Sequence, residues 1–176
     1  MRDLLVKHRR TILKRWFDLI LETYPSDTAT LMKKDRDPFT NPVGSTMLRE
    51  IEVILRGLCQ ECTAQACSAS LDSILKIRSV QDFSPSEAVG FVLLLKKAIE
   101  GALKGEIEKP GAREEWLNFQ VNIDALSLQA FDLYVACREK VYEIRMNQAR
   151  AEKEMAFKMV ERMTTSKEKR KKKEKN

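Results

Sequence analysis

Four cysteines and a single histidine are the residues of this chain whose side chains most readily carry chemistry. Three of the cysteines are close enough in sequence to suggest a zinc or iron–sulfur site: Cys59, Cys62 and Cys67. On a continuous helix, at about 100° per residue, Cys59 and Cys62 share a face, whereas Cys67 lies about 140° from Cys62. We therefore predict buried structural thiols and no metal site, with these three cysteines as the candidate ligands of the alternative.

The histidine, His8, is near the apolar stripe of the first predicted helix, and its neighbours Lys7 and Arg9 oppose its protonation. We interpret it as a residue at the edge of the core. One histidine excludes two-histidine metal sites, and the sequence has neither a glycine-rich phosphate loop nor a serine in a nucleophile elbow. The sequence therefore predicts a protein that is not an enzyme and that has no catalytic residue and no cofactor.

The net charge of +6 is concentrated at the end of the chain. The last ten residues contain seven Lys or Arg and two Glu, a net charge of +5, and the rest is nearly neutral. A docked duplex normally needs a basic face on folded structure, and this basic segment has no aromatic residue to stack on bases. We predict a disordered basic tail over residues 164–176 and no specific nucleic-acid partner. A weak contact of the tail with an anionic surface is the alternative.

Hydrophobic runs in the sequence are short. The longest, residues 88–95, falls well short of the roughly 20 residues that span a bilayer, so we predict no transmembrane segment. Basic residues interrupt the N-terminal segment, which therefore does not resemble a signal peptide. These features predict a cytoplasmic protein with reduced cysteines.

Proline, glycine and capping residues divide the chain into helices. The spacing of Leu5, Ile12 and Trp16 predicts a first helix that ends before Pro25. Ser45 is the expected N-cap of a helix that follows a loop. The capping box Ser84-Pro85-Ser86-Glu87 predicts the start of a helix that is apolar almost all round and therefore central. No alternating strand pattern is present, so the sequence predicts an all-α bundle.

From Ala112 onward the chain contains no glycine or proline, which predicts one long helix as far as Met163. Apolar residues recur on it every seven positions and form a weak heptad seam. Two copies of the chain can pair along such a seam, which predicts a homodimer. The alternative, up to Tyr142, is that the seam packs on the body of its own chain. The predicted dimer or partner interface consists of Tyr134, Cys137, Val141 and Ile144.

Three stretches of the sequence together resemble a known family: Trp16-Phe17 through Tyr24-Pro25, then Asn41-Pro42-Val43-Gly44, then IRSVQDFSPSEAVGFVLLLKKAI over residues 77–99. They are similar to the N-terminal domain of the RsbRD family of RsbT co-antagonists. The resemblance implies a globin-like helical domain that does not hold haem, that dimerises, and that sends a linker helix into a C-terminal STAS domain. Here only a charged tail follows the linker-like helix, so a STAS domain is not expected.

The residues and the resemblance together predict a regulatory or sensory module related to stressosome co-antagonists, which signals in a stress response through protein contacts. Its expected parts are a globin-like domain over residues 1–145, a helix continuation over 146–163 and the basic tail. A small apolar cavity is expected at Phe91, Leu94 and Trp116. The alternative function, implied by stand-alone family members in anaerobic sulfur-metabolising bacteria, is a cysteine-based redox or metal-binding accessory protein of an electron-transfer system.

Overall fold

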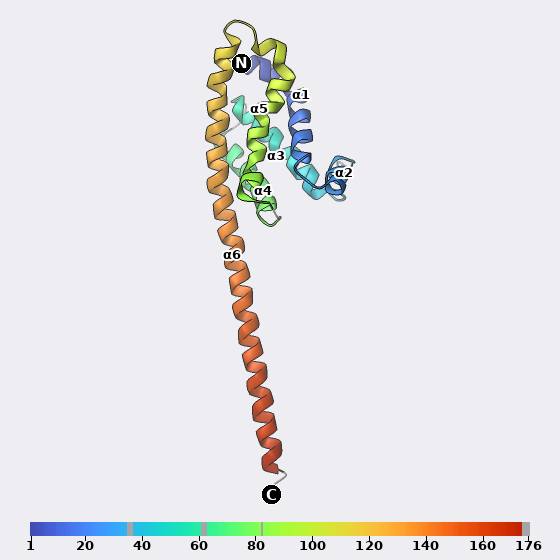
Figure 1. The fold of residues 1–176 in the computed structure, drawn as a ribbon, viewed down its shortest axis with the longest axis vertical. Helices are drawn as coiled ribbons and strands as arrows, with labels where there is room; N and C mark the ends of the chain where they lie inside the picture. Colours follow the sequence, from blue (N-terminus) through green and yellow to red (C-terminus); the bar gives the residue numbers. More distant parts are fainter. Residues whose placement is uncertain (35–36, 61–62, 82, 174–176) are drawn as a thin grey trace. The chain divides into compact units, whose positions relative to one another are not determined.

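The structure, a computed structural model, describes residues 1–34, 37–60, 63–81 and 83–173, and it describes side chains, except that of residue 64, as far as Met163 (Figure 1). These ranges contain six α-helices and no β-strand. The all-α fold class and the long C-terminal helix are therefore confirmed. No helix within the described ranges has the length and apolar character that crossing a membrane requires. The helices are α1 (Arg2–Leu21), α2 (Ser26–Lys34), α3 (Pro42–Leu58), α4 (Ala64–Ser79), α5 (Pro85–Ile107) and α6 (Ala112–Lys173).

Two compact units divide the chain, Met1–Cys137 and Arg138–Asn176. The first unit contains α1 to α5 and the beginning of α6, and it ends before residue 145, where the sequence analysis placed its domain boundary. The helix α6 extends to Lys173, beyond its predicted end at Met163.

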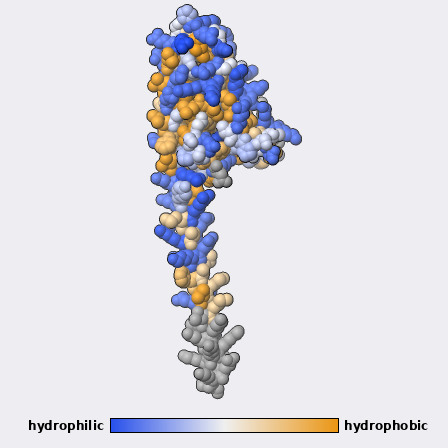
Figure 2. Space-filling view, viewed as in Figure 1, coloured by the Kyte–Doolittle hydropathy of each residue, from blue (hydrophilic) through white to orange (hydrophobic). Residues whose placement is uncertain are grey.

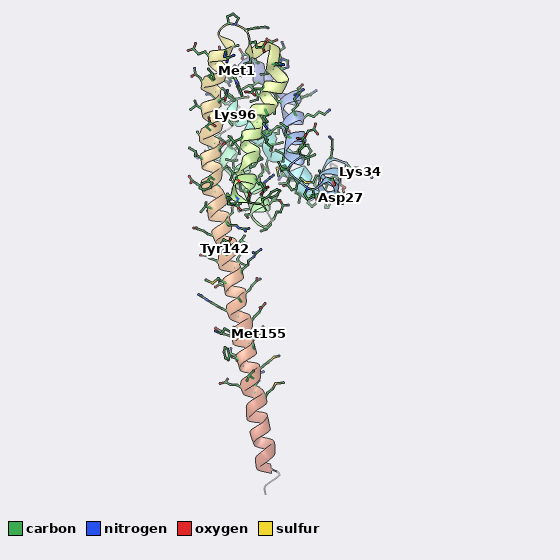
Figure 3. All side chains as sticks on the ribbon, in the orientation of Figure 1. Met1, Asp27, Lys34, Lys96, Tyr142 and Met155 are labelled. Atoms are coloured by element: carbon green, nitrogen blue, oxygen red, sulfur yellow. The ribbon has the colours of Figure 1, made fainter. Side chains whose placement is uncertain are left out.

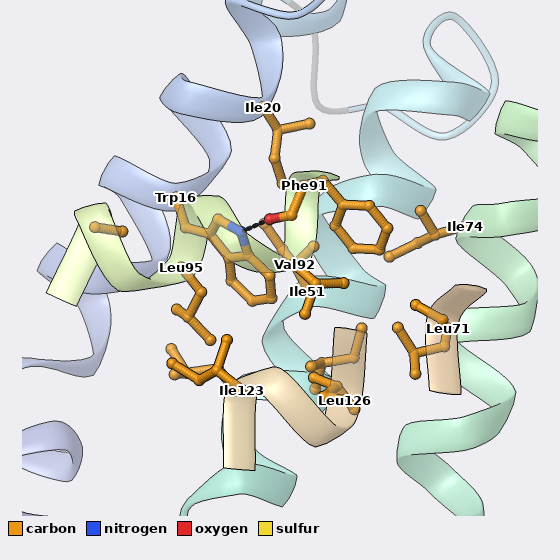
Figure 4. Close-up of a cluster of buried hydrophobic side chains, with 14 of the residues drawn as sticks. Trp16, Ile20, Ile51, Leu71, Ile74, Phe91, Val92, Leu95, Ile123 and Leu126 are labelled. Carbon is orange, nitrogen blue, oxygen red and sulfur yellow. Dashed lines mark hydrogen bonds between the residues drawn. The ribbon is translucent and has the colours of Figure 1, made fainter. Parts of the chain in front are cut away.

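In the core of the first unit, α1 packs against α5 and α3, and α4 packs against α3 and α5 (Figure 1). Trp16 of α1 stacks on Phe91 of α5 with ring centroids 6.4 Å apart, and its indole Nε1 donates a hydrogen bond of 2.7 Å to the Phe91 carbonyl (Figure 4). Both side chains are fully buried. One face of α5 therefore belongs to the core, whereas Leu93 on another face of the helix is 45% exposed.

The helix α3 begins earlier than predicted. Asn41, not Ser45, is its N-cap, because the Asn41 Oδ1 accepts a hydrogen bond of 2.9 Å from the Gly44 backbone N–H and Pro42 occupies the first turn. The Asn41 Nδ2 also donates to the Met32 carbonyl at 2.8 Å, which joins the last turn of α2 to the start of α3.

Gly44 lies against this junction, and we expect Gly44→Ala to lower the free energy of unfolding by about 2 kcal/mol. A Cβ atom at Gly44 would lie 2.7 Å from the Asn41 Oδ1 and 2.8 Å from the Met32 carbonyl oxygen, so both hydrogen bonds would have to shift. Urea unfolding measures the change. The control is Gly90→Ala in α5, where an added Cβ meets no atom within 4 Å and helix propensity should raise stability. Equal effects of the two substitutions would contradict the prediction.

The capping box at the start of α5 is confirmed. The Glu87 N–H donates to the Ser84 Oγ at 3.3 Å, and the Ser84 N–H donates to the Glu87 Oε2 at 2.9 Å. The side-chain hydrogen bond from Ser84, followed by the backbone one, lowers the pKa of Glu87 below its ordinary value of 4.5.

Because the folded protein holds Glu87 at a lowered pKa, its charged form contributes stability that is present at neutral pH and is lost as the pH falls from 4.5 through the folded pKa. We therefore expect the difference in melting temperature between the wild type and Glu87→Gln to be larger at a pH of about 7 than at about 3. Thermal unfolding followed by circular dichroism checks this, and a difference that is constant with pH would contradict it.

Gly111 ends the turn into α6 with a backbone φ of +82°, a conformation that favours glycine. The helix α5 runs through Gly101 and Gly105 and ends at Ile107. The backbone departs from helical geometry at Leu103, whose buried side chain belongs to the core. Burial of that side chain compensates for the weak helix propensity of the two glycines.

Candidate functional site

Arg78, near the C-terminal end of α4, is a fully buried charged residue. Three aromatic rings surround its guanidinium carbon, with centroids at 4.1 Å for Phe83, 5.1 Å for Tyr24 and 5.7 Å for Phe91. Tyr24 and Phe83 meet edge to face at 5.1 Å. We call Arg78 and these three aromatic residues the arginine cage. Such cation–π contacts are strongest when the cation is desolvated, as it is here.

Hydrogen bonds from the guanidinium join three parts of the first unit. The Arg78 Nη2 donates to the Thr23 Oγ1 at 3.1 Å and to the Glu87 backbone carbonyl at 3.2 Å, and the Nη1 donates to the Tyr24 hydroxyl at 3.4 Å. The Nε is buried and makes no hydrogen bond within the described part of the chain. The cage therefore holds the turn after α1, the end of α4 and the start of α5 together.

Burial is the main influence on the titrating groups of the cage. It lowers the pKa of Arg78 from its usual value, against the opposing effect of Tyr24 and Glu87. It also raises the pKa of Tyr24, so the phenol stays protonated. A guanidinium keeps its charge under such conditions, and its terminal nitrogens already donate to the chain itself. The cage is therefore suited to holding the fold together.

One face of α6 completes the core of the first unit. Tyr134, predicted to lie in an interface, is 2% exposed and belongs to this core. Cys137 is partly buried, and its Sγ donates to the Asp72 Oδ1 of α4 at 3.8 Å. Burial, followed by the nearby Asp72, raises the pKa of the Cys137 thiol. Both residues therefore pack on the body of their own chain, which is the alternative that the sequence analysis gave for this part of the seam. The buried α6 residues are Trp116, Phe119, Ile123, Leu126, Ala130 and Tyr134.

A second apolar stripe runs along α6 on a face about 140° from the buried one, at 100° per residue. We call it the outer stripe. Its side chains are 38–70% exposed although all are large and hydrophobic. They follow one another at steps of four, seven, three and four residues, the spacing of a heptad seam. Figure 2 shows hydrophobic residues along the side of the first unit that α6 forms in Figure 1. The outer stripe consists of Leu117, Val121, Leu128, Phe131 and Val135.

Asp124 interrupts the outer stripe and forms an ion pair of 2.6 Å with Lys96 of α5, which lies beside α6 in Figure 3. This pair and the buried face fix the rotation of α6 about its own axis within the first unit. The stripe is therefore held facing away from the core. A row of exposed apolar side chains is typical of a surface that contacts another protein.

The two remaining predicted interface residues lie in the second unit. Ile144 is 50% exposed, and Val141 is partly exposed.

The three residues predicted to line an apolar cavity differ in their burial. Phe91 is fully buried in the core, and Leu94 is partly buried. Trp116 lines an open hollow of about 280 Å³ between the end of α5 and the start of α6. Its other lining residues include the charged side chains of Glu100, Lys104 and Arg113 and the apolar side chains of Ile107 and Leu117, so its wall is mixed in character.

The cysteines named as alternative metal ligands lie at the ends of two helices. Cys59 is buried and caps the C-terminus of α3, whereas Cys67 lies in the first turn of α4 and is partly exposed. Cys62 lies outside the described residues. Within the described ranges, no group of three or more His, Cys, Asp or Glu residues is arranged to hold a metal ion.

The histidine at the core edge, His8, is partly buried, and its Nε2 has no hydrogen-bond partner within the described residues.

Comparison with known families assigns the domain. Residues 10–149 match the family described as the RsbT co-antagonist protein rsbRD N-terminal domain. The chain belongs to this family. The match extends from α1 to beyond the outer stripe, so both the arginine cage and the stripe lie inside the RsbRD N-terminal domain.

One relative of this RsbRD domain protein is an uncharacterized protein of Archaeoglobus fulgidus. It is 23% identical over 155 residues, which cover 87% of this chain and 92% of the relative. The similarity therefore extends over nearly the whole of both proteins. No solved structure matches the chain.

Two features of this RsbRD domain were missed by the sequence analysis. Arg78 follows the buried Ile74 and Leu75 of α4 by four and three residues, and that spacing already places it on their face. The outer stripe has a heptad spacing as regular as that of the seam through Tyr134 and Cys137, which was predicted to be the interface. Exposure of the side chains, which the spacing does not determine, distinguishes the two seams.

Proposed function

We propose that the protein is a regulatory or sensory module that works through protein contacts, in the manner of the stressosome co-antagonists. Membership of the RsbRD N-terminal family supports this role. The proposed site of action is the cytoplasm, and the proposed mechanism needs no catalytic residue. The observation that carries the proposal is the outer stripe, a row of large apolar side chains held on a face of α6 that the core does not use.

The proposed partner of the outer stripe is a second copy of the chain. The stripe has steps of three, four and seven residues, as in the heptad seams by which α-helices interlock side by side, and two copies present identical stripes to each other. Association would remove the five stripe side chains from water. Val141 and Ile144, exposed to different degrees in the second unit, remain proposed contacts with a second copy or another protein.

The proposed domain is globin-like and does not use haem. A haem-binding globin supplies a histidine to the iron from a helix near the centre of the fold. The helix at the centre here, α5, has no histidine in its sequence, and the only histidine of the chain, His8, is in α1. The sensed signal in this proposal therefore reaches the protein by a route other than haem iron.

Size-exclusion chromatography with light scattering tests the proposed pairing. At tens of micromolar we expect a mass of two chains of 20.3 kDa each, with dissociation on dilution. A strict monomer at that concentration would contradict homodimerisation. A pull-down from the native cell, with the outer stripe intact or disrupted, then tests whether a further protein binds the same face.

A further inference from the structure

The second unit carries its own exposed apolar residues near the end of the described side chains. Five large hydrophobic side chains there are each 61–69% exposed to solvent, and Figure 3 labels the first of them, Met155. They lie on the part of α6 that precedes the basic segment. These residues are Met155, Phe157, Met159, Val160 and Met163.

Apolar and polar residues are separated around the helix in this segment. At about 100° per residue, the five hydrophobic side chains and Ala156 occupy one arc of about 200°. The charged residues occupy the remaining arc: Glu154, Lys158, Glu161 and Arg162. The window 154–163 is therefore an amphipathic helix in which no charged residue interrupts the apolar face.

The residues that follow are strongly basic. Seven Lys or Arg and two Glu make up nearly all of the last ten residues, and they account for most of the net charge of +6. An apolar helix face next to a cluster of basic residues is the combination by which helices bind the surface of an anionic membrane. We propose that the apolar face of residues 154–163 inserts into the interface of an anionic lipid bilayer, to which the basic residues of 167–175 attract it.

Charge favours an anionic bilayer over two other possible partners of this segment, a second copy of the chain and a nucleic acid. A second copy aligned in parallel along the apolar face would bring two strongly basic segments together, and their repulsion opposes that pairing. A nucleic acid would neutralise the basic residues but would leave the apolar face in water. An anionic bilayer satisfies both features, because it presents negative headgroups above an apolar interior. This proposal uses only the second unit and does not rest on the proposed homodimer.

Co-sedimentation of the full-length protein with lipid vesicles tests the proposal. We expect binding to vesicles of phosphatidylglycerol mixed with phosphatidylcholine and much weaker binding to phosphatidylcholine alone. The double substitution Phe157→Gln and Met163→Gln keeps every charge and the helix propensity but removes apolar surface, so binding should fall about tenfold or more.

The matched control is Glu154→Gln with Glu161→Gln. It also introduces two glutamines, but it places them on the charged arc of the helix. Its binding should equal or exceed that of the wild type, because it removes negative charge. Absence of wild-type binding to anionic vesicles would overturn the proposal, as would equal binding by the apolar double variant. If light scattering instead shows that the apolar variant loses a dimer while vesicle binding is unchanged, the face pairs copies of the chain, and the membrane proposal is also wrong.

Discussion

Replacing Arg78 with alanine is expected to lower the free energy of unfolding by about 3 kcal/mol. The substitution removes the side chain at the centre of the arginine cage and leaves a space between Tyr24, Phe83 and Phe91. It also removes the donors of three hydrogen bonds, including the one to the Glu87 carbonyl. The cost of desolvating the guanidinium is recovered at the same time, which keeps the expected loss near the middle of the range for large core truncations.

Urea unfolding at one fixed protein concentration measures this loss, since any association of the chain would otherwise change the apparent stability. Two further variants separate charge from packing. Arg78→Met fills the cage without a charge and should cost less than Arg78→Ala. Arg78→Lys keeps a charge, but its ammonium is more strongly hydrated, has no flat face to stack on the rings and carries all its donors on one nitrogen, so it should cost more than Arg78→Met. A change within about 0.5 kcal/mol for Arg78→Ala would show that the cage does not stabilise the fold.

The double substitution Leu128→Asp and Phe131→Asp in the outer stripe is expected to convert the proposed homodimer into a monomer. Both side chains are exposed in the single chain, at 70% and 49%, so the fold of the first unit should persist. In a paired stripe the new carboxylates would be buried without partners and close to one another. We expect dissociation to become at least 100-fold more favourable, about 2.7 kcal/mol. Light scattering over a dilution series measures the change in mass.

The control for this variant is Asn122→Asp with Gln129→Asp, which adds the same charge to exposed positions of α6 outside the outer stripe. These two positions lie about 120–140° around the helix from the first stripe residue, Leu117, at 100° per residue. The control should keep the mass of the wild type. If both variants dissociate alike, added negative charge is the cause. If neither dissociates, the copies pair through another surface, and the outer stripe loses its proposed role.

The two heptad seams of α6 illustrate what sequence spacing leaves undecided. The seam through Tyr134 and Cys137 was predicted to be an interface, with packing on the same chain as the alternative. In the structure, Tyr134 is buried in the core and Cys137 contacts Asp72. Leu128 and Phe131, on another face, are exposed. Periodicity shows that a helix has an apolar face, but it does not show whether that face meets its own chain or solvent.

The amino-acid sequence alone was enough to predict the helical character of the chain, the long C-terminal helix and the capping box of α5. These features depend on local backbone preferences and on helix periodicity, which a few neighbouring residues define. The tertiary structure decided which face of α6 the core uses and that Arg78 is buried within an aromatic cage. Both depend on residues far apart in the chain, such as Tyr24 with Arg78 and Lys96 with Asp124, that only the packing of the helices brings together.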